Sequence, residues 1–250
     1  MAELGLSGLV AVAVAMLCGG AVKGMVGIGL PIVSISIMSS FLGAPTTALA
    51  LIILPIVVSN LWQMLRAGHA LSSLKRFWPI LLTLPAGLWW SAGLVVAISP
   101  QMLFGLLGGI VVCFSMTVYL APNLRVAAPA EKWAGAVAGL AGGLIGGVST
   151  VYGPPVTLYL VALRLPKEVF IGATGLIWFC AALPLTAAYV YHGVLTAELA
   201  AWSALACVPA IGGQLLGQRV RDRIDQESFR KLLLAALLLL GLNLIRRAFL

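Results

Sequence analysis

Long apolar runs alternate with short polar segments along the chain, and almost every charged residue lies between the runs. A helix of about 20 apolar residues crosses a hydrocarbon core of about 30 Å. The pattern therefore predicts an all-α polytopic membrane protein. The runs cover residues 4–22, 24–65, 77–99, 102–120, 133–163, 169–191, 199–218 and 232–245.

Glycine and proline interrupt two of these runs. One interruption reads Gly-Ile-Gly-Leu-Pro at 27–31, and the other reads Val-Tyr-Gly-Pro-Pro at 151–155. Such residues break a helix and free backbone groups that hydrocarbon cannot satisfy, so each break must be buried in protein or line a polar cavity. Paired breaks at matching positions of two halves indicate the binding site of a transporter.

The breaks belong to a repeat whose members lie 124 residues apart. The aligned pairs are Gly19 with Gly143, Gly29 with Gly153, Pro31 with Pro155, Pro85 with Pro209 and Gly93 with Gly217. The shared order predicts a duplication, with a first repeat over 1–124, a second over 125–250 and a polar linker at 121–132 between them. Each repeat is predicted to hold a hairpin and three helices: 4–40, about 45–65, 77–98 and 102–120, then 133–163, about 169–191, 198–218 and 230–247.

Lys and Arg gather in the loops at 66–76, 125–132 and 219–231, which predicts a cytoplasmic location for all three. The segments at 99–100 and 192–193 carry neither residue and are expected outside. With these loop locations, the number of membrane crossings is correct only if residues 133–163 enter and leave on one side of the membrane. The segment is therefore predicted to be a hairpin of two half-helices. The first hairpin enters from the other side, so the halves are inverted, an arrangement typical of alternating-access transporters.

An alternative remains for the first hairpin. Residues 4–22 are long enough to cross the membrane completely, which would place Lys23 at a cytoplasmic turn.

Composition excludes a soluble globular protein, because 62% of the residues are hydrophobic, 9% are charged and the mean hydropathy is +1.10. The net charge of +8 is spread over short loops, which the positive-inside bias explains without a nucleic-acid partner. The first 22 residues lack a basic leader region and are interpreted as a membrane segment that is retained. Four cysteines lie singly in apolar runs and indicate neither a disulfide framework nor a metal site: Cys18, Cys113, Cys180 and Cys207.

The acidic residues all fall at the ends of apolar runs or in loops. They are Glu3, Glu131, Glu168, Glu198, Asp222, Asp225 and Glu227. Cation sites and proton relays inside membranes usually need buried carboxylates, so the sequence argues against both. The interior offers donors instead, namely Lys23, Ser149, Thr150 and the helix N-termini after each break, which together predict an anion site.

Each of these side chains also has an ordinary structural role open to it. Lys23 can extend to the membrane surface, and the two hydroxyls can bond to carbonyls of their own helix. Five other residues can either line the substrate path or pack helices together. They are Asn60, Gln63, Gln214, Tyr152 and Trp178.

No arrangement of residues supports an enzyme. The Gly-Val-Ser-Thr sequence at 147–150 resembles a serine-protease turn only loosely. His69 and His192 are predicted in loops on opposite faces, and no pair of metal ligands has helical spacing.

Several motifs carry a resemblance to a known family. They are the Lys-Gly-x-x-Gly-Ile-Gly-Leu-Pro stretch at 23–31, the glycines from Gly143 to Gly147 that lead into Gly153-Pro154-Pro155, and the basic segment at 219–231. Over essentially the whole chain they resemble the TauE/SafE sulfite-exporter family, also called the toluene sulfonate uptake permease family. The resemblance implies a bacterial-type multi-pass inner-membrane permease for small sulfur-containing anions such as sulfite, sulfoacetate or other organosulfonates. Many members have three consecutive glycines in the break, whereas this chain does not, so the resemblance leaves the anion open.

Taken together, the sequence predicts an inner-membrane anion permease without cofactor or metal, in which the substrate lies between two hairpin tips. Its partners are a small anion and the lipid bilayer, and a homodimer is left open. A passive anion channel and a non-transporting membrane scaffold or assembly protein are the alternatives. The predicted substrate-binding residues are Lys23, Gly24, Gly27, Gly29, Pro31, Asn60, Gln63, Ser149, Thr150, Tyr152, Gly153, Pro154 and Trp178.

Overall fold

The structure, a computed structural model, is mostly helical in the residues that it describes and has no strand among them, which confirms the all-α prediction for them. Those residues are 5–42, 45–68, 70–96, 99, 102, 125–225, 227, 228, 231, 235, 239, 242 and 246. The helices predicted at about 102–120 and 230–247 lie almost wholly outside this part of the chain, as do Glu3, His69 and Cys113.

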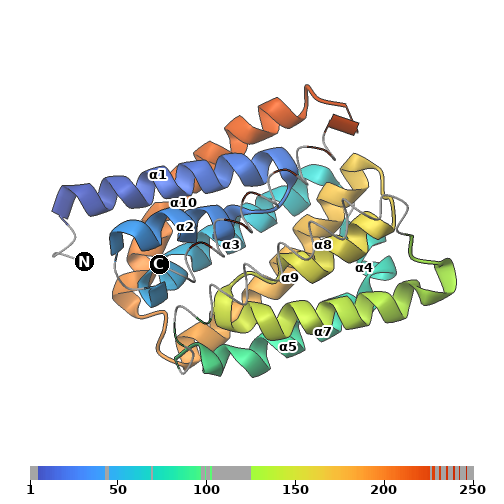
Figure 1. The fold of residues 1–250 in the computed structure, drawn as a ribbon, viewed down its shortest axis with the longest axis horizontal. Helices are drawn as coiled ribbons and strands as arrows, with labels where there is room; N and C mark the ends of the chain where they lie inside the picture. The colour runs from blue at the N-terminus through green and yellow to red at the C-terminus, as the bar shows by residue number, and fades with distance from the viewer. Residues whose placement is uncertain are drawn as a thin grey trace.

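The helices follow one another in the order shown in Figure 1. They are α1 (Gly5–Val26), α2 (Leu30–Leu42), α3 (Pro45–Ala67), α4 (Ala70–Arg76), α5 (Trp78–Ala92), α7 (Glu131–Ser149), α8 (Gly153–Ala162), α9 (Lys167–Tyr191) and α10 (Ala197–Arg221), with 3-10 turns η2 (Gly93–Val96) and η3 (Ala128–Ala130). Within the described residues, four stretches are long and apolar enough to cross a membrane: Gly8–Val26, Thr46–Ala67, Lys167–Tyr191 and Ala197–Arg221.

Both glycine- and proline-rich passages break the chain between two helices, as predicted. Residues 27–29 separate α1 from α2, and 150–152 separate α7 from α8. Gly27 and Gly29 have φ values of 84° and 104°, which glycine adopts without steric penalty. Pro154 lies in the first turn of α8, where its missing N–H would have no helical partner anyway.

The two arms of each hairpin differ in length, whereas the sequence predicts half-helices. α1 has 22 residues and α2 has 13, while α7 has 19 and α8 has 10. At 1.5 Å per residue α1 is about 33 Å long, enough to cross a bilayer core, and α8 is only about 15 Å long. The first arms are long because each packs along most of its length against a helix from the other half of the chain.

Close helix pairs form the outer parts of the molecule. α1 lies along α10, α5 lies along α7, and α3 packs on α9 between these two pairs (Figure 1). A Cβ built on Gly213 would lie 2.0 Å from the carbonyl oxygen of Leu17, and one on Gly143 would lie 2.5 Å from that of Leu84. Glycine therefore allows the backbones to approach closely, as is typical of helix contacts in membranes.

The loops predicted to be cytoplasmic meet at one end of the helices. The contacts there join Arg76 to Glu131 (2.6 Å), Arg66 to Asp222 (3.4 Å) and the Lys167 ammonium to the carbonyl of Ile224 (3.2 Å). The hydrogen bond to Glu131 raises the pKa of Arg76, so this ion pair stays charged. α7 and α9 both begin at this end, so the two ends of the α7–α8 hairpin lie at the same end of the molecule.

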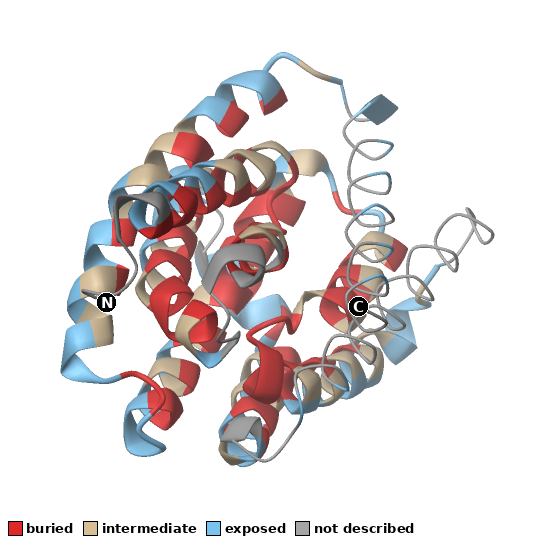
Figure 2. Ribbon diagram, turned by 60° about the vertical axis from the view of Figure 1, so that its left-hand side comes forward, coloured by how far each residue is buried: buried red, intermediate tan, exposed pale blue. Residues whose placement is uncertain are grey.

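Buried residues face the interior, and large apolar side chains cover the outside (Figure 2). Trp90 is 79% exposed, and Leu71 and Trp133 are each 77% exposed. Exposed apolar surface on this scale is expected against lipid and not against water. The interior also holds polar side chains, among them Lys23, Asn60, Gln63 and Gln214.

Candidate functional site

A small cavity lies where the two helix breaks meet. Its volume is about 40 Å³, and a cavity needs about 10–15 Å³ to hold one water, so it has room for a small polyatomic ion. None of the lining residues is acidic. They are Lys23, Ile28, Gly29, Leu30, Pro31, Ile32, Ile56, Ser59, Asn60, Thr150, Val151, Tyr152, Gly153, Pro154 and Trp178.

Lys23 is the cation of this cavity. Its side chain comes from the last turn of α1, the residue is 4% exposed, and its ammonium donates a hydrogen bond to Oδ1 of Asn60 on α3. The Tyr152 hydroxyl interacts with the same Asn60 side chain. Lys23 therefore lies inside the protein and neither reaches the membrane surface nor forms a solvent-exposed turn.

No carboxylate pairs with Lys23 among the described residues, and its one hydrogen-bond partner there is the neutral amide of Asn60. A buried charge costs several kcal/mol unless an opposite charge and hydrogen bonds offset the lost hydration. A bound anion would supply both.

Thr150 adds a buried hydroxyl to the wall of the cavity. The residue is 1% exposed and lines the cavity, and its Oγ1 has no hydrogen-bond partner in the described part of the chain. A buried hydroxyl without a partner costs about 1–3 kcal/mol. Thr150 also has a φ of 60°, a left-handed conformation that is unfavourable for a β-branched residue. This conformation ends α7, where the N–H of Thr150 donates to the carbonyl of Gly146 (2.7 Å), and it leaves the hydroxyl beside the cavity.

α2 and α8 both begin at the cavity, where Gly29 and Gly153 are lining residues. Tyr152, which precedes α8, makes no side-chain hydrogen bond that caps the helix. Pro154 and Pro155 remove two N–H donors from this turn, so the N–H of Gly153 and the helix dipole remain. Both ends place partial positive charge around the cavity.

Aromatic and aliphatic side chains form the rest of the wall. The rings of Tyr152 and Trp178 lie 5.2 Å apart, and both residues are buried. Sequence reasoning missed the lining residues Ile28, Leu30, Ile32, Ile56, Ser59 and Val151. Ser59 could have been found, because it belongs to a polar stripe with Asn60, Gln63 and Arg66 on one side of α3.

Four predicted site residues do not line the cavity, namely Gly24, Gly27, Ser149 and Gln63, the last of which is described below. Gly24 packs against α10, since a Cβ there would lie 2.1 Å from the carbonyl oxygen of Gln214. The Ser149 hydroxyl donates to the carbonyl of Ile145 (2.8 Å) and accepts from the N–H of Val151 (3.0 Å), so it holds the break together. Gly27 faces a neighbouring contact between α3 and α9.

The glutamines join helices. Nε2 of Gln63 donates to the carbonyl of Ile171 (3.0 Å) and to Oγ1 of Thr174 (2.8 Å), which ties α3 to α9. Nε2 of Gln214 donates to the carbonyl of Ser59 (3.1 Å) and ties α10 to α3. Of the buried amides, only Asn60 lines the cavity in the described structure.

The sequence model of the sulfite exporter TauE/SafE family matches residues 12–244. The chain belongs to this family. TauE/SafE proteins are membrane transporters of sulfur-containing anions, and the match includes both helix breaks and every residue that lines the cavity. Neither a curated protein nor a solved structure matches the chain.

The chemistry of the cavity agrees with the chain's membership of the TauE/SafE family. The cavity combines one cation, one unpaired hydroxyl and two helix N-termini. In the described residues no three His, Cys, Asp or Glu side chains gather to hold a metal ion. The cavity can therefore bind a small anion by charge and hydrogen bonding.

Proposed function

We propose that this TauE/SafE protein is an alternating-access permease of the inner membrane that moves a small sulfur-containing anion, such as sulfite, sulfoacetate or another organosulfonate. The anion lies between the two hairpin tips. The Lys23 ammonium supplies the opposite charge, and Thr150 and the N–H of Gly153 donate hydrogen bonds. The observation that carries this proposal is the buried Lys23, which meets no carboxylate of the described residues and lies in a cavity bordered by both helix breaks.

Size favours sulfite among these anions. The cavity of about 40 Å³ matches an ion of a few atoms, whereas an aryl or long-chain sulfonate would need Tyr152 and Trp178 to move apart. We therefore assign sulfite as the preferred substrate.

We further propose that the halves are inverted repeats, 1–124 and 125–250. Two observations support this arrangement. α1 runs from left to right in Figure 1 and α7 from right to left, and the first arm of each hairpin packs on a helix of the other half, α1 on α10 and α7 on α5. α3 and α9 pack on each other at the centre, where a twofold axis relating the halves would pass.

Replacement of Lys23 tests the proposed site. Lys23→Met keeps the length of the side chain and removes the charge, so sulfite affinity should fall at least about tenfold, as expected for a hydrogen-bonded ion pair. Thermal stabilisation of the purified protein by sulfite and uptake of radiolabelled sulfite into proteoliposomes both measure the loss.

Lys75→Met in the exposed helix α4 is the matched control and should behave as the wild type. Sulfite binding by Lys23→Met at wild-type strength would refute the assignment of Lys23. Accumulation of sulfite against its gradient separates the proposed carrier from a passive channel.

A further inference from the structure

A second, larger cavity lies beside the first, at the end of the molecule where the charged loops meet. Its volume is about 220 Å³, and charged and amide side chains from α3, α9 and the end of α10 line most of it. We call it the vestibule. Its lining residues are Gln63, Arg66, Ala67, Glu168, Ile171, Gln218, Arg221 and Asp222.

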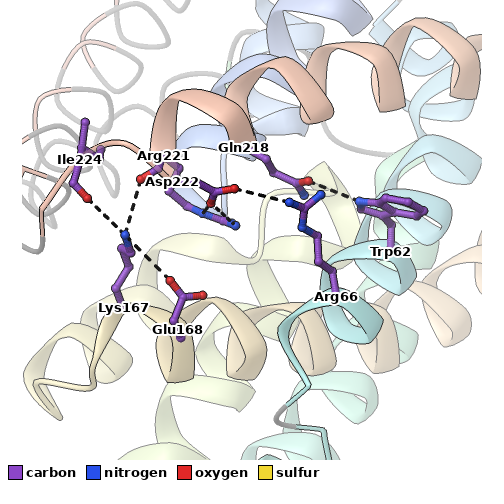
Figure 3. Close-up of polar contacts among 8 residues, drawn as sticks. All are labelled: Trp62, Arg66, Lys167, Glu168, Gln218, Arg221, Asp222 and Ile224. Carbon is purple, nitrogen blue, oxygen red and sulfur yellow. Dashed lines mark hydrogen bonds and ion pairs between the residues drawn. The ribbon is translucent and has the colours of Figure 1, made fainter.

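Two arginines and two acidic residues line the vestibule, and Lys167 beside it makes three positive and two negative charges in this cluster of described residues. Asp222 accepts from Arg221 (Oδ1 to Nη2, 3.1 Å) and from Arg66 (Oδ2 to Nη2, 3.4 Å), so one carboxylate serves two guanidinium groups (Figure 3). Glu168 already pairs with Lys167 at 3.9 Å. The Arg221 side chain is only 6% exposed, and burial strengthens its need for negative charge. The cluster therefore has an excess of one positive charge beside open volume.

A thin contact separates the vestibule from the central cavity. Gln63 and Ile171 line the vestibule, and Asn60, one turn earlier on α3, lines the central cavity. A Cβ on Gly27 would lie 2.6 Å from Cδ1 of Ile171 and 3.7 Å from Nε2 of Gln63, so the first break touches this contact. The hydrogen bond from Gln63 to Thr174 joins α3 to α9 at this contact.

We propose that the vestibule is a second anion site, in which Arg66 and Arg221 bind sulfite or a like oxyanion in exchange for Asp222. This inference rests on the proposed function, because it assigns the same anion to both cavities. Arg66 is the residue that releases Asp222 and binds the anion, since its bond to Asp222 is long and its side chain is 47% exposed. The planar guanidinium groups suit an oxyanion, which they can bind through two parallel hydrogen bonds.

Two substitutions that break the same ion pair give opposite results if the proposal is correct. Both are made in the Lys23→Met protein, so that residual binding of radiolabelled sulfite by the purified full-length chain reports the vestibule. Arg66→Gln removes a ligand of the anion and should weaken residual binding about fivefold, and Asp222→Asn removes the competing carboxylate and should strengthen it by about the same factor. Without sulfite, Asp222→Asn should unfold at a lower temperature than Arg66→Gln, because it also removes the carboxylate that pairs with the buried Arg221.

Absence of residual binding in Lys23→Met would overturn the second site and leave the central one intact. Equal changes in one direction for Arg66→Gln and Asp222→Asn would also overturn it, because the ion pair would then act only in holding α3 to α10. The central site fails separately, if Lys23→Met binds as much sulfite as the wild type with the same affinity. In that case the comparison of Arg66→Gln with Asp222→Asn still decides whether the vestibule binds the anion.

Discussion

At the scale of single residues, Thr150 has two unfavourable features at once, a left-handed backbone and a buried hydroxyl without a partner. Unfavourable features of this kind persist at binding sites because a ligand or the surrounding structure compensates for them. In the proposed site, Thr150 would lower the stability of the empty protein, and an anion that accepts from its hydroxyl would offset part of that cost.

Substitution at position 150 separates these two effects. Thr150→Gly removes the left-handed penalty and the unpaired hydroxyl, so the anion-free protein should gain about 1 kcal/mol or more of stability. The same change should weaken sulfite binding, because a hydrogen-bond donor is lost. Melting temperatures with and without sulfite measure both effects. Thr150→Ser keeps the hydroxyl and should bind sulfite nearly as well as the wild type, and full sulfite affinity in Thr150→Gly would contradict a binding role for this hydroxyl.

The sequence identified Lys23 and Thr150 as candidates because a cation and a hydroxyl beside glycine-rich breaks are conspicuous in apolar runs. It could not show that Asn60 accepts the hydrogen bond from Lys23, since the two residues lie on different helices and meet only through tertiary packing. Gln63 is the opposite case, because the sequence predicts it as a site residue and it does not line the central cavity. The rotation of α3 turns its amide to α9, and no local pattern in the sequence determines that rotation.

At the scale of helices, the breaks could be predicted because glycine and proline act locally, whereas arm length could not. α1 ends at the break, but its close packing on α10 depends on contacts between distant parts of the chain. Gly213 and Gly212 are adjacent on α10 but differ in surroundings, since a Cβ on Gly213 would overlap the backbone of α1 and one on Gly212 meets no atom within 4 Å.

This neighbouring pair provides a test of close helix packing. Gly213→Ala should destabilise the protein by about 1–3 kcal/mol, as an overpacked contact does. Gly212→Ala should be neutral or stabilise it by up to about 1 kcal/mol, because alanine favours the helix over glycine. Thermal unfolding in detergent compares the two proteins. Equal melting temperatures would mean that α1 and α10 do not approach each other this closely.

At the scale of the whole molecule, the charged loops meet at one end and the contact of His192 with Gly93 lies at a different, uncharged turn between helices. The positive-inside rule assigns the charged end to the cytoplasm. Single cysteines at Ser99 and Ser228, in a protein whose own cysteines have been replaced, should therefore react with an impermeant thiol reagent from opposite sides of the membrane. Labelling of both positions from one side would refute the proposed topology.

The packing of α1 on α10 also determines the order in which the protein can be assembled. α1 leaves the ribosome long before the helix that its glycine-rich face contacts, which spans residues 197–221. During most of synthesis the first hairpin is in the membrane without its partner, and Lys23 has no completed cavity around it. α7, in contrast, finds α5 already inserted when it emerges. The second hairpin can therefore reach its final position first, although it is made last.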